Sequence, residues 1–506
     1  MDFDLVITNG VCVTASDVAP LDVAIRDEKV VLLAPSGSLA QAKATRVIDA
    51  EGAYITNLTH IMDEQPGGVD CHVHLQEPVM FGKGSSSDTF ETGTRSAIAG
   101  GCTTIVPFAP QSKNEPSLLK ALAETHGRAR GNCYCDYGFH LLVANPGEQA
   151  LSELKALKED EGVSSLKIYM TYAALQLRDD QILSVMLNAR QNEILTMIHA
   201  ENGDVLNWLT DQLEAQNLVA PKYHATSRPA ILEAEATNRA IALSSLVANT
   251  PILLVHVSDP DAAARIRAAQ TAGQPVFAET CPQYLFLTRD DLDRPGFEGA
   301  KCVCSPPPRD AEGQEGIWRG LRNGTFTVLS SDHCPFDYDD KDKGKKACVT
   351  PEHPEGQFRH IPNGIPGVET RLPLVFSAGR LPLTKFVEVT STNPARLYGL
   401  YPRKGGIMPG VSDADLVVWY PEGKRPDVTL TNGMLHHATD YTPYEGRRVG
   451  NWPRYTVLRG RVVWDRDGGG VVGEKDYGRF LKRESSSLDR VWEDVREQGL
   501  FTVASL

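Results

Sequence analysis

The sequence lacks the features that mark several common classes of protein. No apolar run approaches the roughly 20 residues that a membrane-spanning helix needs. The start, MDFDLVITNG, carries Asp2 and Asp4 in place of the basic segment of a signal peptide. No dense block of Lys and Arg occurs, and 51 basic against 65 acidic side chains give a net charge of −14. These absences predict a cytoplasmic protein with no membrane and no nucleic acid as partner.

Cysteine is present but scattered, which argues against a disulfide framework. Ten cysteines along 506 residues fit a reducing compartment. Cys133/Cys135 and Cys302/Cys304 form two C-x-C pairs, each on one face of an expected strand. A structural zinc site would need two such pairs within tetrahedral reach. We favour the interpretation that these are small buried side chains, with a zinc site as the alternative.

Short alternating strands occupy both ends of the chain. The segments DLVITNGVCVTA and LDVAIRDEKVVLLAP are separated by turn residues, and DADLVVWYP and YTVLRGRVVWD repeat the pattern near the C-terminus. We therefore predict one small β-sandwich domain built from residues 1–66 and 404–480. Residues 481–506 have the pattern of an amphipathic tail helix.

The middle of the chain alternates between apolar β-branched runs and helical patterns, which predicts an α/β fold with a TIM-like (β/α)₈ barrel over residues 67–403. A six-stranded open sheet is the alternative. One helical pattern, DTFETGTRSAIAGG, is expected to start at a capping box of Asp88 and Glu91 and to stop at Gly100-Gly101. The expected strands are GVDCHVHL (68–75), TTIVPFA (103–109), YGFHLLVA (137–144), SSLKIYMTY (164–172), ILTMIHAE (194–201), PILLVHVSD (251–259), PVFAETCP (275–282) and TVLSSDHCPF (327–336).

A long polar loop follows the last expected strand. Residues 337–360, DYDDKDKGKKACVTPEHPEGQFRH, are predominantly polar. Loops of this length in compact domains are often functional lids or flexible insertions.

Six polar side chains lie on or just after the expected barrel strands, where the carboxyl ends converge on one mouth. Each has an ordinary explanation alone, such as a core histidine or a lysine that reaches the rim, but their convergence predicts a metal site. Imidazole and carboxylate ligands suit zinc or another divalent first-row metal, and the number of ligands favours two ions. The six residues are His72, His74, Lys167, His199, His256 and Asp332. A lysine beside two cations would be repelled, unless carbon dioxide converts its amine to a bridging carbamate.

These residues carry a resemblance to a known family. The H-x-H pair, the strand-four lysine, two single histidines and the strand-eight aspartate resemble the ligand set of the amidohydrolase superfamily. Phrases such as PGGVDCHVHL, MIHAENGD, CSPPPR and PNGIPGVETRLPL are similar to the dihydropyrimidinase/hydantoinase family, and closest to its fungal-type dihydropyrimidinases. The resemblance runs from about residue 3 to about residue 480.

The resemblance implies two zinc ions in each subunit, with named ligands. His72 and His74 would bind the more buried zinc together with Asp332. His199 and His256 would bind the more exposed zinc. Lys167, carbamylated to N6-carboxylysine, would bridge the pair together with a hydroxide, which would be the nucleophile.

The resemblance also implies roles around the substrate. Asp332 would be general base and then general acid, and Tyr172 would hydrogen-bond the developing oxyanion. Ser305 and Asn363 would hold the ring amide by main-chain groups. The ordinary alternatives are a rim aromatic for Tyr172, a turn for Asn363 and a strand end for Ser305. Cys334 is disfavoured as a nucleophile, because no base is assigned to it.

The implied reaction is the hydrolysis of 5,6-dihydropyrimidines such as dihydrouracil and dihydrothymine to N-carbamoyl-β-amino acids, in reductive pyrimidine catabolism. The first alternative is a hydantoinase acting on 5-substituted hydantoins or a related cyclic imide. Met80 and Phe81 offer an apolar wall for a ring substituent, but they do not choose between six- and five-membered rings. The second is a non-catalytic scaffold of the same fold, but such relatives lack metal ligands. The family resemblance further implies a homotetramer.

One segment departs from the family pattern. The run NLTHIMDEQ, Asn57 to Gln65, stands between two phrases that would otherwise join directly. It is either a genuine surface loop or coding sequence retained by an incorrect gene prediction. We expect His60, which lies within it, to bind no metal.

Overall fold

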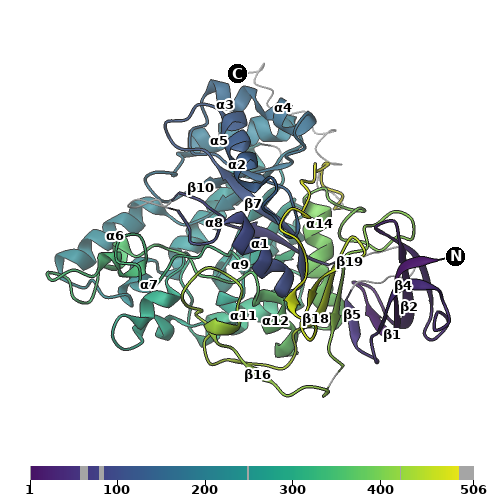
Figure 1. Ribbon diagram of the computed structural model, residues 1–506. Coiled ribbons are helices and arrows are strands. Elements are labelled where there is room, and N and C mark those ends of the chain that lie inside the picture. Colours follow the sequence, from purple (N-terminus) through teal and green to yellow (C-terminus); the bar gives the residue numbers. More distant parts are fainter. Residues whose placement is uncertain (1, 57–66, 79–84, 248–249, 422, 489–506) are drawn as a thin grey trace.

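The computed structural model describes residues 2–56, 67–78, 85–247, 250–421 and 423–488 (Figure 1). The inserted run 57–65 with His60, the wall residues Met80 and Phe81, and most of the expected tail helix lie outside these ranges. Residues 481–488 are described and are not helical.

A parallel barrel forms the centre of the molecule, as predicted. Its sheet has the strand order β14-β13-β12-β11-β10-β9-β7-β6, and each of these neighbouring pairs is parallel. The short β8 (Asp136–Tyr137) pairs with β7. The strands are β6 (Gly68–Val73), β7 (Cys102–Pro110), β9 (His140–Leu142), β10 (Ser165–Tyr169), β11 (Leu195–His199), β12 (Ile252–Leu254), β13 (Val276–Thr280) and β14 (Val328–Leu329).

The first and last strands nearly close the barrel. Val73 of β6 and His333, which follows β14, form a parallel bridge. The His74 amide also donates a hydrogen bond to the His333 carbonyl over 2.7 Å. Closure brings the H-x-H pair next to the end of the last strand, as the strand-end prediction requires.

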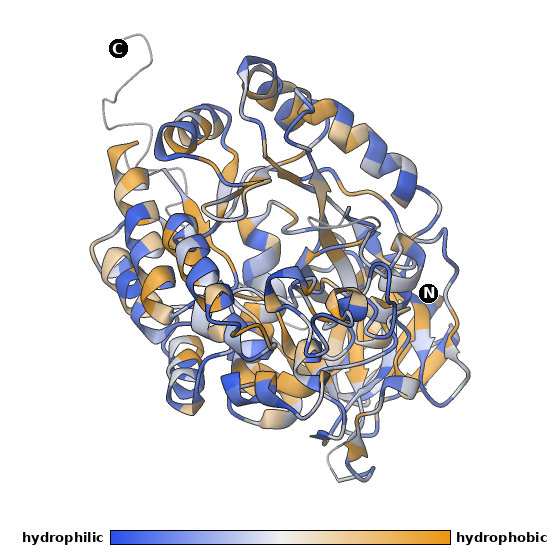
Figure 2. Ribbon diagram, turned by 90° about the vertical axis from the view of Figure 1, so that its left-hand side faces the viewer, coloured by the Kyte–Doolittle hydropathy of each residue, from blue (hydrophilic) through white to orange (hydrophobic). Residues whose placement is uncertain are grey.

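Helices surround the barrel, with their apolar sides toward the strands and their polar sides outward (Figure 2). The helices between the barrel strands are α1 (Phe90–Ala99), α2 (Leu118–Ala129), α3 (Glu148–Ser152), α4 (Leu154–Glu159), α5 (Asp179–Gln191), α6 (Gly203–Ala215), α7 (Tyr223–Ser227), α8 (Ala230–Leu246), α9 (Pro260–Thr271), α10 (Gln283–Phe286) and α11 (Ala311–Arg322). After β14 follow α12 (Arg371–Ala378), α13 (Leu383–Val387) and α14 (Asn393–Leu397). The apolar residues of α1, α2 and α11 fall on one side of each helix, which explains the distribution of apolar and polar sides there.

The start of α1 differs from the prediction by one residue. Thr89, not Asp88, is the N-cap, and its capping box is formed with Thr92. The Asp88 carboxylate instead accepts hydrogen bonds from His333 Nε2 at 2.9 Å and from the Ala438 amide at 2.7 Å. The predicted stop is confirmed, since Gly100 caps the C-terminal end.

Strands from the two ends of the chain form one mixed sheet at the side of the barrel (Figure 1). The joint lies at β5, which pairs with β1 in parallel and with β15 antiparallel. The order is β20-β19-β18-β15-β5-β1-β2-β3, with β4 beside β1. The strands are β1 (Phe3–Val13), β2 (Val18–Arg26), β3 (Lys29–Pro35), β4 (Ala44–Asp49), β5 (Tyr54–Thr56), β15 (Leu416–Trp419), β18 (Pro453–Leu458), β19 (Arg461–Asp465) and β20 (Gly470–Val471). Two further strands, β16 (Val428–Thr429) and β17 (Arg448–Val449), pair separately.

Buried charges join this sheet to the barrel. Lys404 lies between Asp136 of β8 at 2.7 Å and Asp413 at 3.0 Å. Arg459, in the turn between β18 and β19, also pairs with Asp136. The buried carboxylate of Asp136 therefore has two cationic partners, Lys404 and Arg459. Separating these groups would leave an uncompensated buried charge, so the ion pairs fix the sheet to the barrel.

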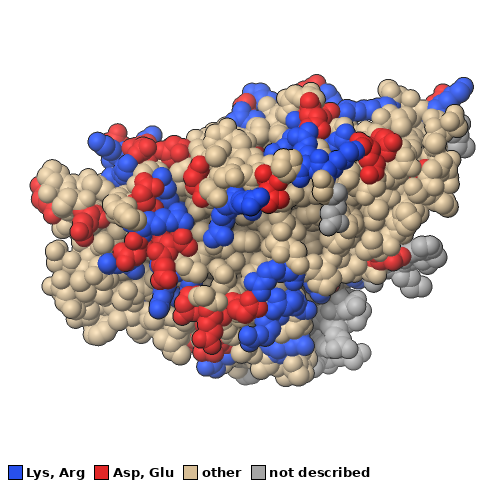
Figure 3. Space-filling model, turned by 90° about the horizontal axis from the view of Figure 1, so that it is seen from below, with Lys and Arg blue, Asp and Glu red and all other residues tan. Residues whose placement is uncertain are grey.

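No helix in the described part of the chain is both long and apolar enough to cross a bilayer. The face seen in Figure 3 carries side chains of both charge signs, and its basic groups stand beside acidic ones.

Candidate functional site

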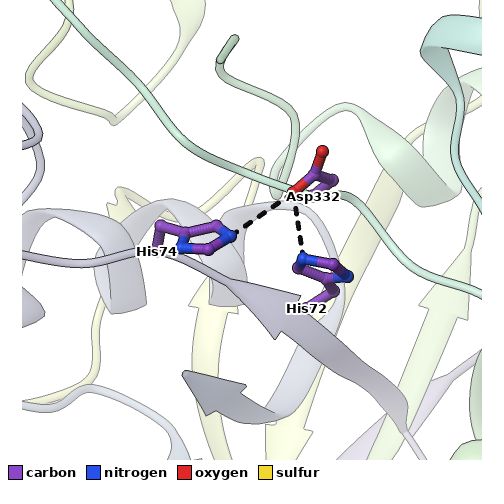
Figure 4. Close-up of side chains that lie close together, drawn as sticks. All are labelled: His72, His74 and Asp332. Carbon is purple, nitrogen blue, oxygen red and sulfur yellow. Dashed lines mark ion pairs between the residues drawn. The ribbon is translucent and has the colours of Figure 1, made fainter. Parts of the chain in front are cut away.

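Three of the predicted residues form a buried group at the mouth of the barrel (Figure 4). His72 lies on β6 and His74 just beyond it, and Asp332 follows β14. Asp332 Oδ1 lies 3.1 Å from His72 Nε2 and 3.5 Å from His74 Nε2. Within the described ranges this is the only group of three such side chains whose ligand atoms are close enough to hold one metal ion.

Two glutamates contact the Nδ1 atoms of the two imidazoles, on the side away from Asp332. Glu279, at the end of β13, lies 2.6 Å from His72 Nδ1, and Glu77 accepts a hydrogen bond from His74 Nδ1. These bonds leave the Nε2 atoms of both histidines facing Asp332, the arrangement that carboxylates give to metal-binding histidines. The sequence analysis missed both glutamates. The position of Glu279 at a strand end was the available signal.

Lys167 lies beside this group. Its Nζ is 2.8 Å from His72 Nε2, and it lies over the rings of Phe108 at 4.6 Å and Tyr169 at 4.9 Å. Burial lowers the pKa of Lys167. A lowered pKa favours the neutral amine, which is the form that reacts with carbon dioxide.

The other two predicted histidines are neighbours in the same place. The rings of His199 and His256 lie 4.5 Å apart, and the His256 ring is 5.4 Å from that of His72. Glu201, which the sequence analysis also missed, lies 2.7 Å from His199 Nε2 and pairs with Arg228 at 2.5 Å. His256 Nδ1 is buried and has no hydrogen-bond partner among the described residues.

The ligand-type residues border a cavity of about 280 Å³. Tyr172, Ser305 and Asn363 line it too, together with the apolar side chains of Leu142, Leu175 and Phe336. The side-chain oxygen of Asn363 is buried, and no residue in the described part of the chain forms a hydrogen bond with it. The structure thus brings together all the predicted ligand and substrate residues. His72 lies beneath the cavity and the other eight line it.

The backbone is strained at three of these positions. The φ angles are +66° at Tyr172, +39° at His256 and +49° at Asp332. Side-chain-bearing residues rarely adopt such angles, and they do so most often at functional sites.

The electrostatics assign different protonation states to two cavity groups. Burial acts to raise the pKa of Asp332, but His72 and His74 lower it to about 2. Burial raises the pKa of Tyr172 to about 12. At neutral pH Asp332 is therefore a carboxylate that can accept a proton, whereas Tyr172 is a hydrogen-bond donor.

The donor set fits a metal centre. Two imidazoles and a carboxylate face one point. Three further nitrogen groups lie close by. They are the ring nitrogen of His256 that has no hydrogen-bond partner among the described residues, the imidazole of His199 and the amine of Lys167. Nitrogen and oxygen ligands of this kind suit zinc.

Comparisons with known proteins agree with this chemistry. The Amidohydrolase family model matches residues 65–463. A D-hydantoinase of Rhizobium radiobacter is 41% identical over 485 residues, which is 95% of this chain and 99% of the relative. A D-hydantoinase of Streptomyces coelicolor is 44% identical over 486 residues, 94% of this chain and 97% of the relative.

A solved structure shares the whole architecture. The dihydropyrimidinase from Brevibacillus agri has a TM-score of 0.87 and 40% identity, and the match covers 96% of this chain and 99% of that one. These relatives are bacterial, so the closer likeness to fungal-type enzymes stays a prediction. The scaffold alternative is disfavoured, because every expected ligand position is filled. The chain belongs to the dihydropyrimidinase/hydantoinase family of the amidohydrolase superfamily, and it is a metal-dependent cyclic amidohydrolase.

Proposed function

We propose that this enzyme hydrolyses 5-substituted hydantoins to N-carbamoyl amino acids. The observation that carries the proposal is a buried His72–His74–Asp332 group beside a cavity that is lined in part by apolar side chains. Leu142, Leu175 and Phe336 are among these side chains and can accommodate a bulky ring substituent. The D-hydantoinases among the relatives support this choice over the dihydropyrimidines that the sequence analysis placed first.

The proposed cofactor is a pair of zinc ions. His72, His74 and Asp332 would hold one, His199 and His256 the other, and carbamylated Lys167 would bridge them. Bound zinc polarises a carbonyl and supplies hydroxide at neutral pH. The carbamate itself would form when the neutral Lys167 amine adds to the carbon of carbon dioxide and releases one proton.

Groups of the protein itself transfer the proton, stabilise the negative charge that develops on the carbonyl oxygen and hold the substrate ring. Asp332, ionised at neutral pH, takes the proton of the attacking water and returns it to the ring nitrogen as the C–N bond breaks. Tyr172 keeps its phenolic proton and donates to the oxyanion that forms at the attacked carbonyl. Main-chain groups at Ser305 and Asn363, on the cavity wall, hold the ring amide.

Six-membered dihydropyrimidines are the second candidate substrates. They present the same cyclic amide to the same groups, and the Brevibacillus agri structure bears the name dihydropyrimidinase. The two classes of substrate differ in the size of the ring and in its substituent. We therefore expect the fit of the substituent against the apolar side chains of the cavity to decide between them.

Steady-state kinetics on both classes test the proposal. We expect kcat/KM for a 5-aryl hydantoin to exceed that for dihydrouracil by about tenfold or more, since burying an aryl group on an apolar wall contributes about 1.5–3 kcal/mol. Replacing Leu142 by Asp should remove this preference while leaving dihydrouracil turnover detectable. If the wild-type enzyme prefers dihydrouracil, dihydropyrimidines become the favoured substrates again. If it hydrolyses no cyclic amide, both substrate classes are refuted.

A further inference from the structure

The long polar loop after β14 contains one lysine that is fully buried. Lys345 begins the short 3₁₀ helix η3 (Lys345–Cys348) and has 0% exposure. Lys341 and Lys343, in the same loop, are exposed. A buried ammonium is costly unless polar groups solvate it, so its contacts indicate what the loop does.

Main-chain carbonyls solvate this ammonium. Lys345 Nζ donates to the carbonyl of Pro362 over 2.9 Å and to that of Val303 over 3.2 Å. No carboxylate of the described residues forms an ion pair with it, and the Tyr441 ring centre lies 6.0 Å away. Burial lowers the pKa of Lys345 to about 8, which leaves it mostly protonated at neutral pH.

The two carbonyls belong to the segments that border the substrate cavity. Pro362 directly precedes Asn363, and Val303 lies two residues before Ser305. The Val303 carbonyl also accepts a hydrogen bond from the Gly364 amide at 3.1 Å, so it joins both segments and Lys345 at one point.

The neighbouring backbone leaves little room for adjustment. Gly364 has a φ of +143°, and a Cβ there would lie 2.3 Å from the Cys334 carbonyl oxygen. The wall formed by residues 303–305 and 362–364 is therefore tightly packed, and a tie between its two halves fixes their spacing.

We propose that Lys345 is a positioning residue for the substrate. Its ammonium ties residues 303–305 to residues 362–364, and so sets the distance between the main-chain groups at Ser305 and Asn363 that hold the ring amide. This inference rests on the proposed function, which assigns the ring amide to those two residues.

The contacts predict an effect on binding more than on metal loading or chemistry. Lys345 makes no described hydrogen bond to the histidines, to Lys167 or to Asp332. Without its ammonium the two segments keep only the Gly364–Val303 hydrogen bond between them, and the ring amide is held less well in every substrate that contains it. The loss should therefore appear in KM for five- and six-membered rings alike.

The test compares K345M with K346M in the full-length, zinc-loaded enzyme. Lys346 is the adjacent lysine, but it is partly exposed and pairs with Asp339 at the surface, so K346M makes the same change of charge away from the wall. For K345M we expect KM to rise about tenfold with both ring classes, the loss of a charged hydrogen bond, with unchanged zinc content and little change in kcat. For K346M we expect wild-type KM.

K345Q provides a graded second variant, because it keeps N–H donors on a shorter, neutral side chain. The KM of K345Q should be about threefold above that of the wild type, between those of wild type and K345M. If K345M does not fold, K345Q provides the test. A wild-type KM in the folded variant overturns the inference, as does a fall in kcat with unchanged KM. Absence of wild-type turnover on any cyclic amide would instead refute the proposed function.

Discussion

At the scale of single residues, Lys167 tests the proposed two-metal centre against a site that holds one metal ion. Its amine is buried 2.8 Å from His72 Nε2, where only a carbamate could serve as a bridging ligand. We predict that K167A loses metal and at least about 10³-fold in kcat, the scale of losing an electrostatic group at the reacting atoms. Short carboxylates added to the buffer should restore part of the activity.

Lys158 on α4 supplies the matched control, because burial lowers the pKa of this lysine too, yet it lies outside the site. K158A should keep wild-type metal content and kcat. Wild-type turnover in K167A would refute the bridge.

The sequence identified ligand-type residues but not the groups that orient them. Histidines on one strand face and at strand ends are visible as a pattern, since periodicity and barrel topology place them together. Glu77 stands among ordinary polar residues, and Glu201 ends an expected strand, as Glu279 nearly does, but only the fold shows that Glu77 and Glu201 contact His74 and His199. The positive φ at Tyr172 likewise left no mark in the residue type.

At the scale of secondary-structure elements, two adjacent residues at the start of α1 are expected to affect different properties of the enzyme. Thr89 should affect the stability of the fold, and Asp88 the activity. Thr89 caps the helix, whereas Asp88 accepts from His333, the neighbour of Asp332. T89A should lower the free energy of unfolding by about 1 kcal/mol with unchanged kcat/KM. D88N should reduce kcat/KM, because it weakens the bond that holds the chain next to Asp332. Thermal unfolding and kinetics on both variants measure this, and equal kcat/KM in D88N and T89A would contradict it.

The barrel strands were predictable because each is an apolar run bounded by turn or helix signals. Their lengths were not, since β14 has only two residues and β12 three, although both runs are longer in sequence. The helix start was misplaced because Asp and Thr are both good caps, and only the tertiary contact with His333 decides between Asp88 and Thr89.

At the scale of the whole molecule, the two ends of the chain pair in one sheet, as their shared alternation predicted. The buried cluster around Lys404 that fixes this sheet to the barrel was not predicted, because its members are far apart in sequence and look like ordinary surface charges. The domain limits at 67, 404 and 481 and the homotetramer stay predictions, and sedimentation analysis would test the latter.

The central claim is that one centre both holds two zinc ions and opens a cyclic amide. The most direct measurement is the zinc content and the hydantoin turnover of one purified sample, before and after a chelator and after zinc is restored. We predict about two zinc ions per chain, loss of turnover with loss of metal, and recovery of both together. Undiminished turnover in metal-free protein, or no turnover of hydantoin or dihydrouracil with two zinc ions bound, would contradict it.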